Sequence, residues 1–349
     1  MNRYKFVFSA FAVCFFIASS SLWAASAPRL RIIATTFPVY DWTRQILGSQ
    51  LENVELIQLQ DNGVDLHNFQ PTVRDMARIS KCDLFMYVGG ESDEWVEKTL
   101  HASGNPRRLT LNMIKELGNA VQEEEPLEGM EEHHHHGKEE HHSEKKEHHH
   151  GKGEHDDDDD DDNDDDEHEI DEHIWLSLRC AATCVKAITK RLGELDREHA
   201  AEYMANCKAY VAKLQALDVR YKDVVAASPL KTLLFADRFP FRYMAKDYGL
   251  TCYAAFSGCS AETEASFKTI AFLAGKVDEC NLSTVIVLET GNSKIAETVM
   301  RTSKSKGLKI LRMDSLQSAV SRDVSRGKSY LGVMESNLSV LKTALGQRN

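Results

Sequence analysis

The sequence of 349 residues has no apolar run long enough to cross a membrane after its first 28 residues. A membrane-spanning helix needs about 20 consecutive apolar residues, so we expect the chain that follows to be a soluble body. The His-Glu-x-x-His pattern of many zinc hydrolases is absent, and no stripe of basic residues resembles a nucleic-acid-binding surface. These absences argue against a membrane-spanning body and a nucleic-acid partner, and they leave a zinc hydrolase as a minor alternative.

The first 27 residues have the pattern of a secretory signal peptide. A positively charged start precedes an apolar core from Phe6 to Ile17, and small residues follow at positions 24–27. We therefore expect residues 1–27 to be removed during export to the periplasm. A lipid anchor on Cys14 is the less favoured alternative, because bulky residues precede this cysteine.

Apolar residues are also scarce between residues 123 and 170, where histidine and acidic residues dominate. Residues 123–172 hold 25 acidic and 4 basic residues, a local charge of −21, whereas the whole chain carries −12. A segment with so little to bury cannot offset the entropy lost on ordering, so we expect residues 123–170 to be a disordered loop. Its concentrated negative charge favours the attraction of cations.

Eleven histidines make this loop a candidate metal collector. Imidazole and carboxylate groups are ligands for divalent metals, and each ion bound by a disordered segment is held more weakly than in a folded site. We expect the loop to raise the local zinc concentration and to pass ions to a folded site; an inert spacer is the alternative. The predicted low-affinity ligands are His133, His134, His135, His136, His141, His142, His148, His149, His150, His155 and His168.

Short apolar strands alternate with amphipathic helices on both sides of this loop, which predicts parallel sheets covered by helices. The expected strands are residues 30–36, 54–58 and 82–88 in an N-terminal domain (28–195), and residues 232–236, 251–255, 284–289 and 308–313 in a C-terminal domain (228–349). Residues 196–227 contain no glycine or proline. The thirty residues from 198 to 227 predict, at about 1.5 Å per residue, one helix of roughly 45 Å that crosses between the two domains.

Several motifs carry a resemblance to a known family: Thr35–Asp41, Gly63–Pro71, Asp83–Gly90, His173–Leu176 and Tyr248–Leu250. In order and spacing they resemble the periplasmic zinc- and manganese-binding proteins of metal ABC transporters, and the histidine-rich insertion before His173 resembles the zinc branch. The resemblance implies an α/β fold of two Rossmann-like lobes with parallel sheets, joined by one long rigid helix, with a metal in the cleft. It also implies docking to a membrane permease driven by a cytoplasmic ATPase. We expect the protein to be a monomer.

His67 and His173 match the two metal-binding histidines that this family places in its N-terminal lobe. Imidazole nitrogen is a ligand of intermediate softness that suits Zn²⁺, whereas Mn²⁺ accepts a more oxygen-rich set. The resemblance therefore favours Zn²⁺ as the bound ion, with Mn²⁺ as the less favoured alternative.

The C-terminal lobe departs from the family pattern. Arg238 stands where the family has a histidine or glutamate ligand, and a guanidinium has no lone pair to offer a metal. Asp314 matches the family's aspartate ligand, and Glu289 ends a predicted strand. We expect His67, His173, Asp314 and Glu289 to form a four-coordinate site. Arg238 is expected to pair with one of these two carboxylates without touching the metal.

Seven cysteines follow the signal segment, and an odd number in an oxidising compartment leaves at least one free thiol. Cys180 and Cys184 lie one helical turn apart and are expected to be buried apolar residues rather than metal ligands. One disulfide is expected among Cys252, Cys259 and Cys280, and the pairing is left open.

Three further interpretations stay open. A periplasmic zinc buffer or an adhesin would need the same metal site but no permease. A zinc hydrolase would need an open coordination position and a general base beside the metal. Arg238 could also indicate an anionic ligand or a metal complex in place of a bare cation.

Overall fold

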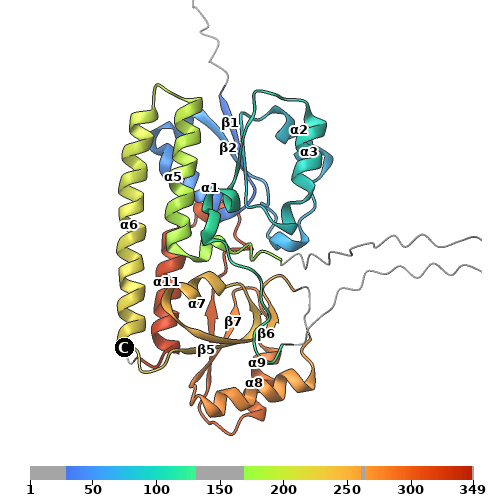
Figure 1. Ribbon diagram of the computed structural model, residues 1–349, viewed down its shortest axis with the longest axis vertical. Coiled ribbons are helices and arrows are strands. Elements are labelled where there is room, and N and C mark those ends of the chain that lie inside the picture. The colour runs from blue at the N-terminus through green and yellow to red at the C-terminus, as the bar shows by residue number, and fades with distance from the viewer. Residues whose placement is uncertain (1–28, 131–168, 261–263, 348–349) are drawn as a thin grey trace, which may run out of the picture.

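The computed structural model describes residues 29–130, 169–260 and 264–347. The predicted signal peptide over residues 1–27, Cys14 and the eleven loop histidines from His133 to His168 lie outside the described residues. Within the described chain, two α/β lobes are stacked end to end, and long helices run along one side of both (Figure 1).

The N-terminal lobe is built on a four-stranded parallel sheet in the order β2-β1-β3-β4. Its strands are β1 (Leu30–Ala34), β2 (Val54–Gln58), β3 (Leu84–Tyr87) and β4 (Leu109–Asn112). The three strands expected from the sequence are present. β4 was not predicted, because a run of four residues with only Leu111 buried gives a weak apolar signal.

Helices cover both faces of this sheet: α1 (Phe37–Leu47), α2 (Val73–Lys81), α3 (Trp95–Ser103), α4 (Met113–Leu117) and α5 (Leu178–Leu195). Their starting points follow from local chemistry. Pro38 stands in the first turn of α1, where its missing N–H costs no hydrogen bond. Thr72 and Asp75 form a reciprocal capping box at the start of α2. Cys180 and Cys184 are buried in α5, as predicted.

The helix α6 (Ala200–Ala227) is the long element expected between the lobes. Its 28 residues span about 42 Å at about 1.5 Å per residue. It packs against α1 and α5 of the N-terminal lobe and against α7 and α11 of the C-terminal lobe, and Figure 1 shows it running along both. A single helix that contacts both lobes along its length holds them in a fixed relation.

The C-terminal lobe repeats the plan with a parallel sheet in the order β6-β5-β7-β8. Its strands are β5 (Thr232–Phe239), β6 (Thr251–Ser257), β7 (Thr284–Leu288) and β8 (Lys309–Met313), and its helices are α7 (Arg242–Tyr248), α8 (Phe267–Glu279), α9 (Lys294–Thr302), α10 (Ser321–Val324) and α11 (Tyr330–Ala344). The four strands agree with the sequence prediction.

The two lobes share one continuous apolar core and several buried hydrogen bonds. Trp175 is 1% exposed, and its indole N–H donates to the backbone carbonyl of Ser315 at 2.8 Å. The Tyr330 hydroxyl donates to the carbonyl of Trp175 at 2.6 Å, while the Tyr330 N–H donates to Asp41 at 2.9 Å. Because buried polar groups are costly to leave unpaired, these bonds fix the lobes at the cleft.

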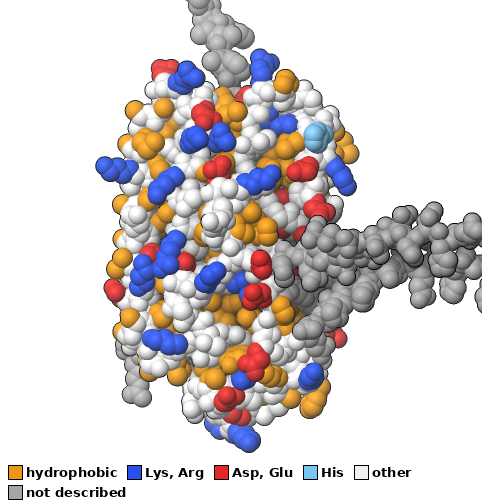
Figure 2. All heavy atoms as spheres, in the orientation of Figure 1, with side chains coloured by type: hydrophobic (Ala, Val, Ile, Leu, Met, Phe, Trp, Pro, Cys, Tyr) orange, Lys and Arg blue, Asp and Glu red, His pale blue; other side chains and the backbone are white. Residues whose placement is uncertain are grey.

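None of the described helices is both long enough and apolar enough to cross a membrane. On the face shown in Figure 2, lysine and arginine side chains are scattered among acidic ones rather than gathered into a stripe. This face therefore offers no basic surface of the kind that binds nucleic acid.

Candidate metal centre

His67 lies in a short 3₁₀ turn, η2 (Leu66–Asn68), on the loop that follows β2. The Asp65 carboxylate caps this turn by accepting the His67 N–H at 3.2 Å, and Leu66 is buried beneath it. The Nδ1 atom of His67 lies 2.9 Å from the hydroxyl of Ser92, in the 3₁₀ turn after β3. With Nδ1 engaged by Ser92, the Nε2 atom is left to face the cleft.

His173 is fully buried and begins a second short turn, η5 (Ile174–Leu176). One oxygen of Asp171 accepts the His173 N–H at 2.8 Å and lies 3.0 Å from the ring Nδ1. A carboxylate on Nδ1 fixes the tautomer and orientation of a histidine, as is common for metal-binding histidines. Nε2 of His173 therefore also faces the cleft.

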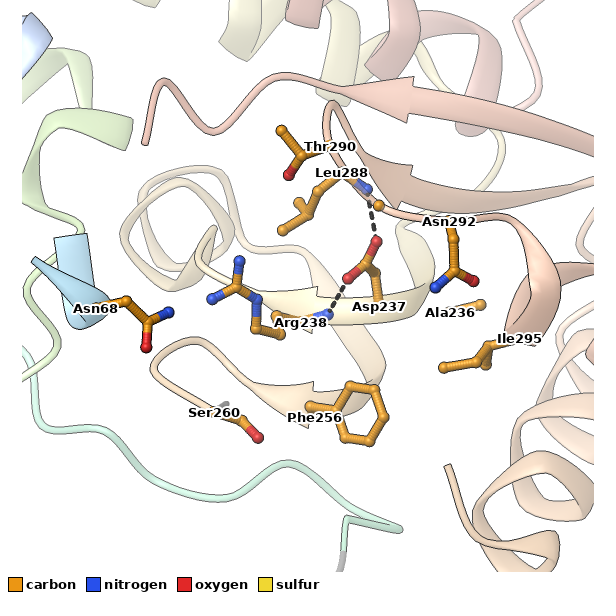
Figure 3. Close-up of a pocket in the computed structure, with 11 residues that line it drawn as sticks. Asn68, Ala236, Asp237, Arg238, Phe256, Ser260, Leu288, Thr290, Asn292 and Ile295 are labelled. Carbon is orange, nitrogen blue, oxygen red and sulfur yellow. Dashed lines mark hydrogen bonds between the residues drawn. The ribbon is translucent and has the colours of Figure 1, made fainter. Parts of the chain in front are cut away.

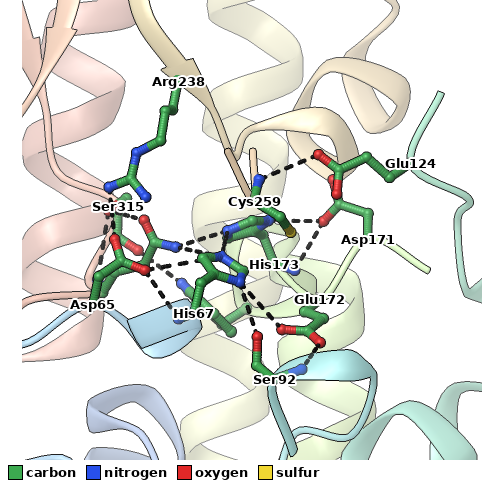
Figure 4. Close-up of polar contacts among 12 residues, drawn as sticks. Asp65, His67, Ser92, Glu124, Asp171, Glu172, His173, Arg238, Cys259 and Ser315 are labelled. Carbon is green, nitrogen blue, oxygen red and sulfur yellow. Dashed lines mark hydrogen bonds and ion pairs between the residues drawn. The ribbon is translucent and has the colours of Figure 1, made fainter. Parts of the chain in front are cut away.

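The two Nε2 atoms meet 3.3 Å apart although the residues are 106 positions apart in the chain, as Figure 4 shows. A tetrahedral zinc ion with Zn–N bonds of about 2.0–2.1 Å holds two ligand nitrogens about 3.3–3.4 Å apart. The separation in this structure already has that value. Two imidazole nitrogens with this spacing can both bind the same cation.

The two imidazoles differ in proton affinity. Burial and the neighbouring charge of His173 lower the pKa of His67 to about 3. Burial also opposes protonation of His173, but the charge and hydrogen bond of Asp171 outweigh it and raise the His173 pKa. Both imidazoles must be neutral to bind a metal ion, so metal binding would compete with protonation of His173.

Buried carboxylates surround the two histidines from the N-terminal side. Asp171 and Glu172 are at most 1% exposed, and Oε2 of Glu172 lies 3.7 Å from Nδ1 of His67. Burial raises the pKa of Glu172 to about 7. One oxygen of Glu172 and one of Glu124 are buried without a hydrogen-bond donor in the described part of the chain. Unpaired buried acceptors next to two imidazoles favour a bound cation.

Arg238 does form an ion pair, but not with the partner expected from the sequence. A guanidinium nitrogen of Arg238 lies 2.6 Å from Asp65 of the opposite lobe, so the predicted pairing with Asp314 or Glu289 is wrong. The register of β5 shifts between Phe235 and Arg238, and such a bulge turns the side chains that follow it. Burial opposes ionisation of Asp65, but the charge of Arg238 outweighs it and lowers the Asp65 pKa.

A cavity of about 230 Å³ lies beside Arg238 at the ends of the C-lobe strands, with Asn68 of the N-lobe on its rim (Figure 3). Asp237 lines it, but both of its oxygens accept backbone N–H groups, from Arg238 at 2.9 Å and Leu288 at 3.0 Å. A Cβ on Gly291 would lie 1.9 Å from this carboxylate, so only glycine allows the approach. Asp237 is therefore a structural acceptor.

Asp314 and Glu289 do not join the two histidines in the structure. Asp314 forms a 2.8 Å ion pair with Lys328. Glu289 accepts the N–H and the hydroxyl of Ser315 at 2.8 and 2.9 Å, and burial together with the Asp314 charge raises its pKa. In the described part of the chain neither acid belongs to the cluster of ligand atoms at the two histidines, so their role as metal ligands stays a prediction.

Gln317, from the same C-lobe loop, takes the place expected for Asp314. Its Nε2 lies 2.8 Å from Nε2 of His173 and 3.2 Å from Nε2 of His67. Leu316 has a φ of 64°, an uncommon value for a residue with a side chain, and this turn directs the next residue inward. No sequence motif indicates such a backbone conformation at a leucine.

Cys259 is the second C-lobe residue that sequence reasoning missed at this site. Among the described residues, the ligand atoms of His67, His173 and Cys259 lie within 4.8 Å of one another. All seven cysteines from Cys82 to Cys280 are free, so the expected disulfide among Cys252, Cys259 and Cys280 is not formed. Burial and the Glu124 carboxylate raise the pKa of the Cys259 thiol.

Comparison with known proteins gives one consistent result. The family model described as "Zinc-uptake complex component A periplasmic" matches residues 32–344. The zinc-binding lipoprotein AdcA of Streptococcus pneumoniae is 29% identical over 99% of this chain and 62% of its own length. The high-affinity zinc uptake system protein ZnuA of Bacillus subtilis is 30% identical over 91% of this chain and 88% of its own length.

Solved structures agree with the sequence relatives. Zn(II)-bound AdcA from Streptococcus pneumoniae superposes with a TM-score of 0.67 at 25% identity, over 92% of this chain and 59% of that one. The metal-dependent lipoprotein YcdH from Bacillus subtilis gives a TM-score of 0.68 at 25% identity, over 90% and 99% of the two chains. The chain spans about three fifths of the length of the AdcA proteins and most of the length of the Bacillus proteins. The chain belongs to the family of periplasmic zinc-uptake complex A components.

Proposed function

We propose that this protein is the extracytoplasmic zinc-binding component of an ABC importer, and that His67 and His173 hold Zn²⁺ in the cleft between its lobes. The observation that carries this proposal is the 3.3 Å separation of two Nε2 atoms, each oriented by a contact on its other nitrogen. That distance equals the ligand spacing of a tetrahedral zinc ion, about 3.3–3.4 Å.

The same geometry argues for capture rather than chemistry. His173 is fully buried and each imidazole is oriented by a contact on its Nδ1 atom, which suits retention of an ion. Family membership likewise supports a solute-binding protein over a zinc hydrolase. Imidazole ligands favour Zn²⁺ over Mn²⁺. An anionic ligand would need the positive charge of Arg238, but Asp65 already neutralises that charge in an ion pair. This supports a bare cation as the bound species.

The partners follow from this role. The zinc-loaded protein docks as a monomer on a membrane permease driven by an ATPase and releases the ion there. Export through the N-terminal signal segment puts it in the periplasm, with a lipid anchor on Cys14 as the alternative. The pneumococcal relative is named a lipoprotein, which supports keeping the lipid anchor as an alternative. The histidine-rich loop acts as a low-affinity collector that feeds the cleft.

Zinc titration of the metal-free full-length protein against a competing chelator tests the proposal. The wild type should retain one ion at chelator concentrations that strip the weaker loop sites. His67→Ala and His173→Ala should each lower the affinity of that ion by more than about 100-fold, because they remove ligands rather than their supports. His101→Ala, on an exposed residue of α3, is the matched control and should leave it unchanged.

Uptake in cells separates importer from buffer or adhesin. Loss of the protein should abolish growth at limiting zinc, and His67→Ala should reproduce that loss. Removal of residues 131–168 should lower the number of ions bound and reduce uptake only when zinc is scarce. Unchanged affinity in both histidine variants, or unchanged zinc uptake without the protein, would overturn the proposed function.

A further inference from the structure

An ion held between the lobes needs a ligand from the C-terminal lobe. The residue at the position where the family has a histidine or glutamate ligand cannot supply one. Arg238 occupies that position and is engaged with Asp65 at 2.6 Å. Asp314 is paired with Lys328, and Glu289 is held by Ser315. Gln317 reaches both imidazoles through a neutral amide. Among the described residues, no C-lobe carboxylate therefore lies in the cluster of ligand atoms at the two imidazoles.

Cys259 is the C-lobe residue with a metal-binding atom beside both histidines. Its sulfur and the two imidazole nitrogens lie within 4.8 Å of one another, and Figure 4 shows Cys259 approaching His173 from above the pair. In a tetrahedral zinc site, Zn–S bonds of about 2.3 Å and Zn–N bonds of about 2.0–2.1 Å put sulfur and nitrogen about 3.6 Å apart. That spacing is shorter than the 4.8 Å within which the three ligand atoms lie, so the cysteine loop would move inward on metal binding.

The backbone around Cys259 is built for this close approach. A Cβ on Gly258 would lie 2.9 Å from Cε1 of His173 and 3.0 Å from the carbonyl oxygen of Phe239. Only glycine at this position lets the turn after β6 lie directly against the His173 ring. The N–H of Cys259 donates to Glu124 at 3.3 Å, which ties the turn to the segment beside the site.

We propose that Cys259 is the C-lobe ligand of the cleft ion, so that this chain holds its metal through two imidazoles and one thiolate. The inference rests on the proposed function and deepens it, because it names the ligand that replaces the one lost at Arg238. On binding, the thiol proton leaves to solvent and the sulfur lone pair is donated to the metal. A thiolate favours the softer ions Zn²⁺ and Cd²⁺ and disfavours Mn²⁺.

Cobalt substitution of the full-length protein tests this directly. Co²⁺ bound by a thiolate gives a sulfur-to-cobalt charge-transfer absorption in the near ultraviolet, which the loop histidines cannot produce. The wild type should show this absorption at one equivalent, and Cys280→Ser, a control in the same lobe, should retain it. Cys259→Ser, Cys259→Ala and His67→Ala should lose it. Cys259→Ser should also weaken zinc binding at least tenfold while circular dichroism remains native.

The outcomes separate the two claims. The thiolate assignment would be overturned if the cobalt spectrum depends on His67 but lacks the charge-transfer band. It would also be overturned if that band is unchanged in both Cys259 variants. Either result would leave zinc capture by the histidines intact. If the first equivalent of cobalt binds to His67→Ala as tightly as to the wild type, the proposed function and the thiolate ligand are overturned together.

Discussion

The two sides of the cleft are built differently. On the N-lobe side, His67 and His173 occupy the positions that the family motifs predict, and each is oriented by a close contact on Nδ1. On the C-lobe side, Arg238 stands at a ligand position and is paired with Asp65 of the opposite lobe. The N-lobe side thus brings two imidazole nitrogens to 3.3 Å, whereas the C-lobe side places a paired arginine where the family pattern has a ligand.

The charged groups also differ between the two sides of the cleft. The N-lobe half concentrates buried carboxylates around the imidazoles, including Asp171 and Glu172. The C-lobe half brings a guanidinium, a neutral amide and a thiol. A dication entering the cleft is therefore attracted mainly by the carboxylates of the N-lobe.

The largest expected effect outside the ligands themselves comes from the support of His173. Asp171→Asn keeps the size of the side chain but removes the charge that orients Nδ1 at 3.0 Å. Zinc affinity should fall by about 10- to 100-fold, the usual cost of losing such a partner. Chelator competition measures this. A change of less than twofold would show that the N-lobe half is not prearranged by its carboxylates.

An intermediate effect of opposite sign is expected at Arg238. Arg238→Met removes a positive charge from the cleft and leaves the Asp65 carboxylate unpaired, with its oxygen 3.9 Å from Nε2 of His67. Zinc affinity should rise several-fold, because less positive charge opposes the dication. The metal-free protein should lose about 1–3 kcal/mol of unfolding free energy, because an ion pair that is mostly buried is broken.

Zinc titration and urea unfolding of the same Arg238 variant separate these effects. Arg197→Met, at an exposed arginine between α5 and α6, serves as the matched control. A parallel loss of affinity and stability would mean that Arg238 instead supports zinc binding by holding the turn that carries His67.

The smallest effect is expected at Asp314, the acid that the family resemblance assigned to the metal. Asp314→Asn removes a partly exposed ion pair with Lys328, which is worth about 1 kcal/mol or less. Zinc affinity should change by less than about twofold. Calorimetric titration of this variant beside Glu289→Gln checks this, and a tenfold loss in either would return that acid to the site.

Much of this architecture could be predicted from the sequence, for identifiable reasons. The alternation of apolar strands with helices predicted the parallel sheets, and the segment without glycine or proline before residue 227 predicted α6. His67 and His173 were found because each lies in a local motif. β4 was missed because its four residues carry little apolar signal.

The C-lobe half of the site could not be predicted, because it depends on contacts between residues distant in sequence. Arg238 finds Asp65 across 173 positions, and Gln317 is directed inward by a left-handed backbone at Leu316. Cys259 reaches His173 because Gly258 carries no Cβ to hold the two apart. None of these causes leaves a periodic or local pattern in the sequence.

Anomalous diffraction at the zinc absorption edge from crystals of the zinc-loaded protein locates the bound ion. We expect one strong anomalous peak in the cleft, about 2.0–2.1 Å from Nε2 of both His67 and His173. A cleft without a peak, in crystals whose zinc is bound elsewhere on the chain, would contradict it.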